Sequence, residues 1–479
     1  MDQDLGWWVR VALDGWDARP GPRYRRVAEG VAAAIERGLL SAGDRLPAER
    51  ILAEGLGLGR GTVVRCFDEL ADAGLVERRQ GAGTYVRART AWTQAPKQSP
   101  ASALLQRRLD EDRETIDLSL SVPAGTEHLP EVAAGVQADW RGHGLHPAGL
   151  PALRAALATH LTRRLGLPTT ADQLIVTSGA QHALTLVAAA AVSPDRTVIT
   201  ACPTYPGLAG ALAGRGGRLL GVGVDSLGID VNAVRRAAGR LAAPVIYVDP
   251  CGHNPTGAVL TRSRHEPLLA AARSSDGLLV EDLAQAGLAL DEDAEPVPPL
   301  AASDDSVVAI GSLSKMFWAG LRIGWIRAPA ALRGHLLRLR SANDLAPGVP
   351  GQLFAARLLD AVDDAWYGQL RAALAARRDL LVNAIRQRLP AWAVEPPAAG
   401  LSLYARLPLA DSETYAHRAA RYGVLVTPGA ACCVDRRHFA GVRLSIAESP
   451  HTLETAVDRL AAAWEDHSRD VAATRPPGG

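Results

Sequence analysis

Residues 311–324 read Gly-Ser-Leu-Ser-Lys-Met-Phe-Trp-Ala-Gly-Leu-Arg-Ile-Gly and contain Lys315, one of only two lysines in a chain with 52 lysine and arginine side chains. The other, Lys97, lies in a stretch rich in proline, serine and glutamine that is typical of a linker. A desolvated lysine can condense with an aldehyde, whereas the permanently charged guanidinium of arginine cannot. The lysine retained here indicates amine chemistry; chance retention on a surface turn is the alternative.

The neighbours of Lys315 favour the chemical interpretation. Ser312 and Ser314 supply hydroxyls, and Arg322 supplies a fixed cation. A phosphorylated aldehyde needs an amine for its carbonyl carbon, and hydroxyls with a cation for its phosphate.

The pattern Ser-x-Ser-Lys, followed seven residues later by Arg-x-Gly, resembles the cofactor-lysine segment of fold-type I aminotransferases, which depend on pyridoxal 5'-phosphate (PLP). The resemblance implies that Lys315 is the catalytic lysine and forms the internal aldimine. It also implies that Ser312 and Arg322 hold the cofactor phosphate.

Length and charge restrict the class of protein. A chain of 479 residues is too long for one hydrophobic core, so we expect two or more domains. The net charge of +1 argues against bulk attraction to polyanions, so any nucleic-acid site must be local. No apolar run reaches membrane-spanning length, and the acidic start lacks the charge pattern of a signal peptide. We therefore expect a cytoplasmic protein without a membrane partner.

The five cysteines show no Cys-x-x-Cys spacing, which fits a reducing compartment. We expect the adjacent Cys432 and Cys433 to serve buried packing rather than a disulfide or a metal. No metal site is predicted.

The first ninety residues have the pattern of three helices and a hairpin. Pro22 precedes a helix that starts at residue 23 and ends at Gly38, and Pro47 suits the first position of the next helix. The periodicity predicts further helices over 48–54 and 60–73, strands over 75–77 and 84–86, and an arginine- and glycine-rich connection over 78–83. This order is typical of a winged helix-turn-helix. A small packing module with a solvated arginine face is the alternative. Trp7, Trp8 and Trp16 are expected in a short strand or an arm that packs on a neighbour.

Four motifs in this segment occur in order: Gly-Asp-Arg-Leu-Pro-Ala-Glu-Arg, Gly-Arg-Gly-Thr-Val, Gly-Leu-Val and Gln-Gly-Ala-Gly-Thr-Tyr-Val. Together they resemble the GntR-type DNA-binding domain, which implies binding to double-stranded operator DNA. Gly59 stands where that family often has serine or threonine. The residues that the resemblance places at DNA are Arg50, Arg60, Thr62, Gln80 and Gly81.

From residue 115 onward, strand-like runs alternate with helical stretches, which predicts a mainly parallel sheet covered by helices. The strand at 174–177 passes through a small-residue turn into a helix, whose first N–H groups would face an anion. This junction is similar to the phosphate cup of the PLP family. The resemblance assigns to the cup Ser178, Gly179, Ala180 and Gln181.

Further motifs follow in the order of the same family. Tyr205 resembles the aromatic that stacks on the pyridine ring, and Asn254, in Asn-Pro-Thr-Gly, resembles the donor to its 3' oxygen. Asp282 ends a strand, so its carboxylate is expected at the mouth of the sheet, where it would keep the pyridine nitrogen protonated. Arg443 resembles the arginine that clamps the carboxylate of an amino-acid substrate.

Nearly the whole chain therefore resembles the MocR-type subfamily of GntR transcriptional regulators. This implies an α/β protein with a winged helix-turn-helix at 1–88, a linker at 89–114 and a fold-type I domain at 115–470, whose smaller C-terminal subdomain covers about 350–470. The resemblance implies a homodimer that senses a small amine, an amino acid or PLP through aldimine exchange at Lys315.

Two positions depart from the family. Ala284 and His146 stand where tyrosines that contact the cofactor are usual, and Tyr247 is a candidate to replace one of them. An aminotransferase that carries a DNA-binding domain therefore stays open as the alternative function, as does a sensor of PLP alone. Neither the effector, the promoter nor the sign of regulation follows from the sequence.

Overall fold

The computed structural model describes residues 5–9, 13, 15–17, 21–36, 39–41, 43–79, 83–87, 115–132, 143–291, 297–435 and 439–474. The chain divides into two compact units, Met1–Gln98 and Ser99–Gly479. The predicted linker at 89–114 lies outside the described residues.

The first unit is a winged helix-turn-helix. Its elements are α1 (Leu5–Trp7), α2 (Arg23–Glu36), α3 (Glu49–Leu56), α4 (Arg60–Asp72), β1 (Val76–Arg79) and β2 (Gly83–Val86). The two strands pair antiparallel, from Val76 opposite Val86 to Arg79 opposite Gly83. Apolar residues spaced by three or four along the helices, among them Val27, Val31, Phe67 and Leu70, form its core.

Local differences from the sequence predictions have physical reasons. Residues 5–7 form a helical turn rather than a strand. Trp8 is buried in the core of this same unit, and its ring packs edge-on against Trp7. Helix α3 begins after Ala48, so Pro47 precedes the helix instead of opening it. Strand β1 extends through Arg78 and Arg79, because backbone pairing with β2 continues to Gly83. The tip of the wing, residues 80–82, lies outside the described residues.

The second unit is built on a seven-stranded sheet with the order β4-β12-β11-β10-β9-β5-β6. The strands are β4 (Leu174–Thr177), β5 (Thr197–Ala201), β6 (Arg218–Val222), β9 (Val245–Val248), β10 (Leu278–Asp282), β11 (Val308–Ser312) and β12 (Gly324–Arg327). Only β12 runs against its two neighbours. The prediction of a mainly parallel sheet is confirmed.

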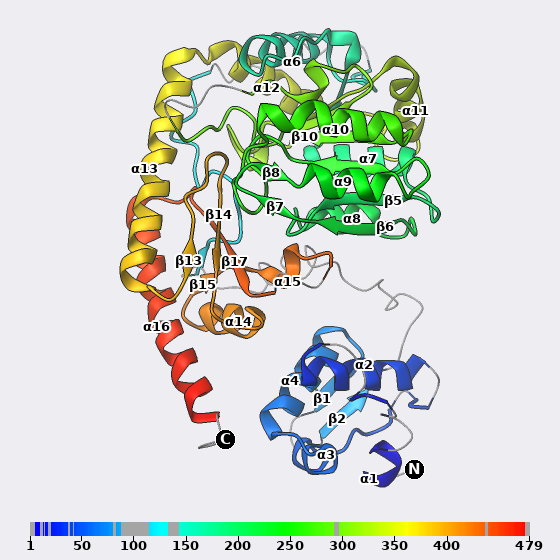
Figure 1. The fold of residues 1–479 in the computed structure, drawn as a ribbon, viewed down its shortest axis with the longest axis vertical. Helices are drawn as coiled ribbons and strands as arrows, with labels where there is room; N and C mark the ends of the chain where they lie inside the picture. Colours follow the sequence, from blue (N-terminus) through cyan, green and yellow to red (C-terminus); the bar gives the residue numbers. More distant parts are fainter. Residues whose placement is uncertain are drawn as a thin grey trace. The chain divides into compact units, whose positions relative to one another are not determined.

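Helices cover both faces of this sheet, as Figure 1 shows. On one face α7 (Ala180–Ala191), α8 (Gly207–Leu212) and α11 (Ala330–Ser341) pack against one set of alternating strand residues. On the other face lie α6 (Pro151–Arg164), α9 (Val231–Ala238), α10 (Arg262–Ser274) and α12 (Val349–Ala361). Burial on both faces explains why the strands read as continuous apolar runs.

A second, antiparallel sheet has the order β13-β14-β17-β16 and its own core. Its strands are β13 (Ala393–Val394), β14 (Ser402–Arg406), β16 (Thr427–Pro428) and β17 (Gly441–Ser445), and its helices are α13 (Asp364–Arg388), α14 (Glu413–Arg421), α15 (Gly429–Cys432) and α16 (Pro450–Thr474). Helices α13 and α16 pack side by side (Figure 1). Nearby, β3 (Ile116–Asp117) pairs with β15 (Val424–Leu425), so the first described residues of this unit join its last third. In the described parts of the chain, no helix is long and apolar enough to cross a membrane.

Candidate functional site

The turn between β4 and α7 brings the start of a helix next to the guanidinium of Arg322. Gly179 caps α7 with a φ of 98°, and a Cβ at this position would lie 2.7 Å from a guanidinium nitrogen of Arg322. That guanidinium donates to the Ser178 carbonyl over 2.6 Å, although 144 residues separate the two in the chain. The start of α7, which comprises Ala180 and Gln181, and a fixed cation therefore face the same space.

Unsatisfied hydroxyl and amide oxygens lie in the neighbouring segments. Ser312 Oγ accepts from the Ser314 N–H over 3.1 Å and donates to the Ile323 carbonyl over 3.3 Å. Ser314 Oγ and Gln181 Oε1 are buried and have no hydrogen-bond partner among the described residues. Such orphaned polar atoms are rare in native proteins and fit a site that a polar ligand completes.

Lys315 lies just beyond the end of β11 and is half-buried. Its ammonium donates to the backbone carbonyl of Ser121. Its charge lowers the pKa of Asp282, which means that the two side chains are close enough to interact.

Asp282 ends β10, and its carboxylate is held from two sides. Tyr247 Oη, on the neighbouring strand β9, donates to Oδ2 over 2.8 Å, and the Ala284 N–H donates to Oδ1 over 2.8 Å. Burial raises the pKa of Asp282, and both hydrogen bonds together with the charge of Lys315 lower it. Ala284 thus contributes through its backbone, and the tyrosine hydroxyl at this carboxylate comes from Tyr247.

Tyr205 follows β5 and lies near charged side chains, among them Asp282. Burial and the nearby charge of Asp282 raise the pKa of its phenol, whereas Arg443 and Arg322 lower it. A Cβ at Gly207 would lie 2.4 Å from the Tyr205 ring, so the glycine lets the backbone pass close to the aromatic.

Asn254 and Arg443 form a direct contact. Arg443 Nη1 donates to Asn254 Oδ1 over 2.9 Å, and the Asn254 backbone N–H donates to Asp249 Oδ2 over 2.7 Å. The hydrogen bond fixes the orientation of the amide, so its nitrogen is the atom available to donate to a ligand. Asp249, whose pKa burial raises, anchors the backbone of this turn.

Arg443 lies on β17 and is 6% exposed. Its Nη2 donates to the Ser119 carbonyl over 2.5 Å and to Thr427 Oγ1 over 3.1 Å. Among the described residues, Nε has no partner. A buried guanidinium with an unused N–H is suited to a carboxylate ligand.

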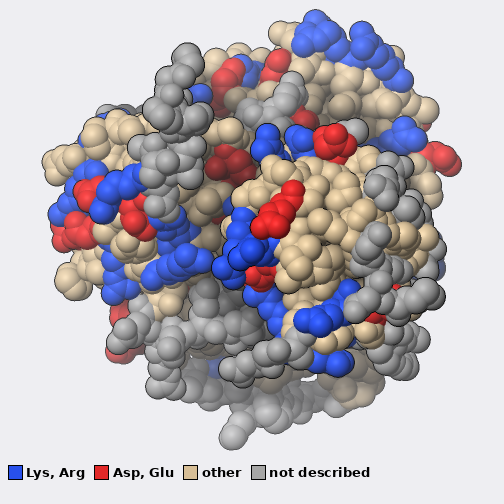
Figure 2. All heavy atoms as spheres, turned by 90° about the horizontal axis from the view of Figure 1, so that it is seen from below, with Lys and Arg blue, Asp and Glu red and all other residues tan. Residues whose placement is uncertain are grey.

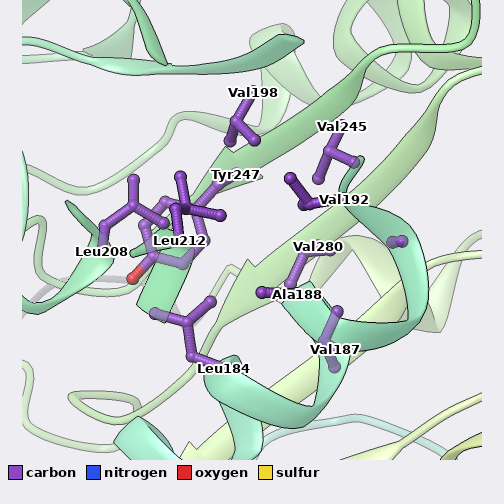
Figure 3. A pocket seen from close by; sticks show the side chains of 11 residues that line it. Leu184, Val187, Ala188, Val192, Val198, Leu208, Leu212, Val245, Tyr247 and Val280 are labelled. Atoms are coloured by element: carbon purple, nitrogen blue, oxygen red, sulfur yellow. The ribbon is translucent and has the colours of Figure 1, made fainter. Parts of the chain in front are cut away.

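A small apolar cavity behind Tyr247 is not part of this site. Figure 3 shows that the side chains around it are hydrocarbon, apart from the Tyr247 hydroxyl. The cavity volume open to the centre of a water molecule is only about 10 Å³, which leaves no room for a cofactor. Its lining residues on α7, α8 and the sheet serve packing.

These contacts connect the residues that the sequence assigned to the cofactor and the substrate carboxylate. Their common position follows from the ends of β4, β5, β9, β10 and β11, which meet at one edge of the sheet. Sequence reasoning missed Asp249, Thr427 and the carbonyls of Ser119 and Ser121. The carboxylate of Asp249, just before the Asn-Pro-Thr-Gly turn, was a usable signal, whereas backbone carbonyls give none.

In the first unit, the candidate DNA contacts differ in exposure. Arg60 is the first residue of α4, and 71% of its side chain is exposed; its Nη2 lies 3.4 Å from Glu49 Oε2. Arg50 on α3 has 81% of its side chain exposed. Thr62 is half-buried in the first turn of α4, and Gln80 and Gly81 lie outside the described residues. On the face drawn in Figure 2, basic and acidic side chains are interspersed. The guanidinium groups of Arg60, at the start of α4, and Arg50, on α3, are therefore both exposed on the first unit.

Comparison with known families assigns both units. The family "Aminotransferase class I and II" matches residues 116–460, and the family "Bacterial regulatory proteins, gntR family" matches residues 23–86. These two matches cover the described elements of both units from α2 to the first part of α16, which continues to Thr474.

Individual relatives agree with both matches. The chain is 28% identical to the probable rhizopine catabolism regulatory protein MocR of Rhizobium meliloti, over 85% of this chain and 86% of that one. It is 30% identical to an aspartate/prephenate aminotransferase of Thermus thermophilus, over 77% of this chain and 96% of the other. A crystal structure of an archaeal alanine:glyoxylate aminotransferase superposes with a TM-score of 0.71 and 26% identity, over 77% of this chain and 96% of that one.

Replacement of Lys315 tests the position of the amine. We expect Lys315→Ala to abolish the visible absorbance band that appears when PLP is added, because no other described side chain offers an amine at this edge of the sheet. The measurement is a PLP titration followed by borohydride reduction and peptide mapping. Lys97→Ala, which removes the other lysine, is the matched control and should retain the band. An unchanged band in Lys315→Ala would refute the assignment.

Replacement of Asp282 tests the cost of a buried carboxylate. Because its pKa is raised by burial, the folded chain binds this proton more tightly than the unfolded chain. Stability is therefore lost as the pH rises from below the aspartate value of about 3.9 through the raised value. At about pH 8, cofactor-free Asp282→Asn should unfold at a temperature no lower than the wild type, and any advantage should vanish in acid.

The same variant should bind PLP at least about 10-fold more weakly, because the amide carries no charge for the pyridinium. Thermal unfolding across pH and PLP titration measure the two effects. Asp172→Asn, whose side chain is 95% exposed, is the control and should change neither. A strong loss of stability in cofactor-free Asp282→Asn would contradict the argument.

Proposed function

We propose that this chain, which belongs to the MocR-type GntR transcriptional regulators and, through its larger part, to the class I and II aminotransferase family, is a PLP-dependent regulator that binds operator DNA and senses a small amine or amino acid. The observation that carries the proposal is the buried set of Asp282, whose pKa the charge of Lys315 lowers, and the hydrogen-bonded pair of Asn254 and Arg443. A domain kept only for dimerisation would have no need to bury these charges.

The residues of the site fit PLP. Ser178, Gly179, Ala180, Gln181 and the side chains of Ser312 and Arg322 would hold the phosphate. Orphaned Ser314 Oγ and Gln181 Oε1 support a polar occupant. When bound, PLP supplies an aldehyde that condenses with a primary amine, first that of Lys315 and then that of an effector.

The remaining residues orient the ring and its electrons. Asp282, whose carboxylate Tyr247 positions, would hold a proton on the pyridine nitrogen. The Asn254 amide would donate to the 3' oxygen, and the ring of Tyr205, which lies near Asp282 and Arg443, would stack on the cofactor. Burial of these groups excludes water from the site and strengthens each electrostatic contact.

Arg443 would select effectors that carry a carboxylate. Its guanidinium is fixed by Asn254, Ser119 and Thr427, so little side-chain entropy is lost when a carboxylate binds. An effector amine that took the place of Lys315 at the cofactor would leave the lysine as a primary amine beside Asp282. DNA affinity then changes only if the effector binds the two conformations of the chain with different affinity.

A second candidate function, an active aminotransferase, is favoured by one observation. Asn254 belongs to an Asn-Pro-Thr-Gly turn and contacts Arg443, an arrangement that suits turnover of an amino acid as well as its recognition. Conversion of an amino acid with pyruvate or 2-oxoglutarate at a steady rate would establish this function. Release of DNA by PLP alone would instead identify a sensor of the cofactor.

Arg60→Ala tests the DNA-binding proposal. The recommended probe is a duplex that the protein itself selects from a random pool, with binding followed by fluorescence anisotropy at fixed salt. Loss of one base contact should weaken binding by about 1–3 kcal/mol and leave the PLP absorbance unchanged. Arg236→Ala, which removes one exposed charge from α9, is the matched control. Equal affinity in Arg60→Ala and wild type would mean that the start of α4 does not face DNA.

Arg443→Lys tests effector recognition. A lysine keeps the charge but lacks the Nε–H group, which has no partner among the described residues of the wild type, so the concentration of an active α-amino acid needed for half of the spectral change should rise about 10-fold, or about 1.4 kcal/mol. The amine that corresponds to this amino acid without its carboxylate is the internal control. The concentration of this amine needed for half of the spectral change should be the same in Arg443→Lys as in the wild type. Equal weakening of both compounds would show that the substitution damages the site rather than the carboxylate contact.

A further inference from the structure

Two cysteines and an aspartate from distant parts of the second unit meet at one edge of the sheet. Cys202 Sγ lies 3.5 Å from Cys433 Sγ, and Asp435 Oδ1 lies 3.0 Å from the first sulfur and 3.4 Å from the second. Cys202 follows β5, whereas Cys433 and Asp435 follow α15. The sequence predicted that the adjacent Cys432 and Cys433 serve buried packing. It gave no sign of the contact between Cys433 and Cys202, which is 231 residues away in the chain.

The backbone around this cluster holds the three side chains in place. The Thr204 N–H donates to the Cys432 carbonyl over 2.8 Å, and the Val434 N–H contacts Cys202 Sγ at 3.4 Å. On β6, a Cβ at Gly221 would lie 2.8 Å from the Cβ of Cys202 and 3.3 Å from Asp435. A glycine at this point of the edge strand therefore leaves the space in which the cluster sits.

We propose that Cys202, Cys433 and Asp435 bind one divalent zinc-type cation, with a water molecule as its fourth ligand. Thiolates bound to a tetrahedral zinc ion at about 2.3 Å lie about 3.8 Å apart, and a thiolate and a carboxylate oxygen lie about 3.5 Å apart. The observed separations of 3.5, 3.0 and 3.4 Å need only a small expansion to reach these values. Binding would replace the two thiol protons and yield a complex with one net negative charge.

The charges of the cluster favour a cation over a disulfide between the two cysteines. Both sulfur atoms face the same carboxylate oxygen, which stabilises a cation between them and disfavours a free thiolate. A disulfide would also leave the carboxylate without its two sulfur contacts.

A cation can reach the proposed site from solvent, and its binding would restrain the chain near Tyr205. Cys202 is fully buried, but Cys433 and Asp435 are half-buried, so a cation can enter from their side. A bound ion would tie residues 433–435 to the end of β5, three residues before Tyr205. No residue assigned to PLP is used, so the site does not depend on the proposed function.

Cobalt titration of the reduced full-length protein tests the proposal. Thiolate ligands and tetrahedral geometry give Co²⁺ intense visible bands, and zinc should displace it. We expect one equivalent to bind and expect Cys202→Ser or Cys433→Ser to weaken binding at least about 100-fold. Asp435→Asn should weaken it about 10-fold, because the charge is lost but an oxygen ligand remains. Cys432→Ser, one residue away, is the matched control.

Three results would overturn the proposal. The first is the absence of thiolate–cobalt absorption in the wild type. The second is an unchanged spectrum in Cys202→Ser. The third is peroxide-driven formation of a Cys202–Cys433 disulfide at the same rate with and without zinc, because a bound ion must protect both sulfurs. Far-ultraviolet circular dichroism of each variant separates loss of the ligand from loss of the fold.

Discussion

The second unit depends on the buried guanidinium of Arg443. It stands on the antiparallel sheet and donates to Asn254 beyond β9, to the Ser119 carbonyl near the start of the unit and to Thr427 on β16. Removing a charge from water is costly unless hydrogen bonds replace its hydration. The guanidinium therefore joins three segments that are far apart in the chain, in addition to the backbone pairing between β16 and β17.

Much of the site was predictable because its determinants are local. A strand that ends in Asp282, or a strand followed by Ser178 and Gly179, shows in a few residues of sequence, and parallel strands bring their carboxyl ends to one edge. The winged helix-turn-helix was predictable for the same reason. Its apolar spacing and glycine-bounded helices are short-range patterns.

The remaining contacts of the site could be identified only from the three-dimensional structure. Tyr247 reaches Asp282 because β9 and β10 pair in a register that aligns their ends, and this register is not visible in either strand alone. The contacts of Lys315 and Arg443 with the carbonyls of Ser121 and Ser119 use backbone atoms that any residue would offer. Cys202 and Cys433 belong to different layers of the unit, so the sequence showed only two unrelated cysteines.

The charges of the site also constrain how ligand binding can act on the chain. The contacts of Asp282 and Arg443 replace only part of the hydration that these groups lose on burial. Burial raises the pKa of Asp282, and Arg443 retains an N–H without a partner among the described residues. A ligand that supplies the missing opposite charges binds the folded unit and not the unfolded chain, so it stabilises the fold by mass action. Stabilisation alone transmits nothing to DNA. Regulation requires that the ligand also favour one of two conformations of the chain.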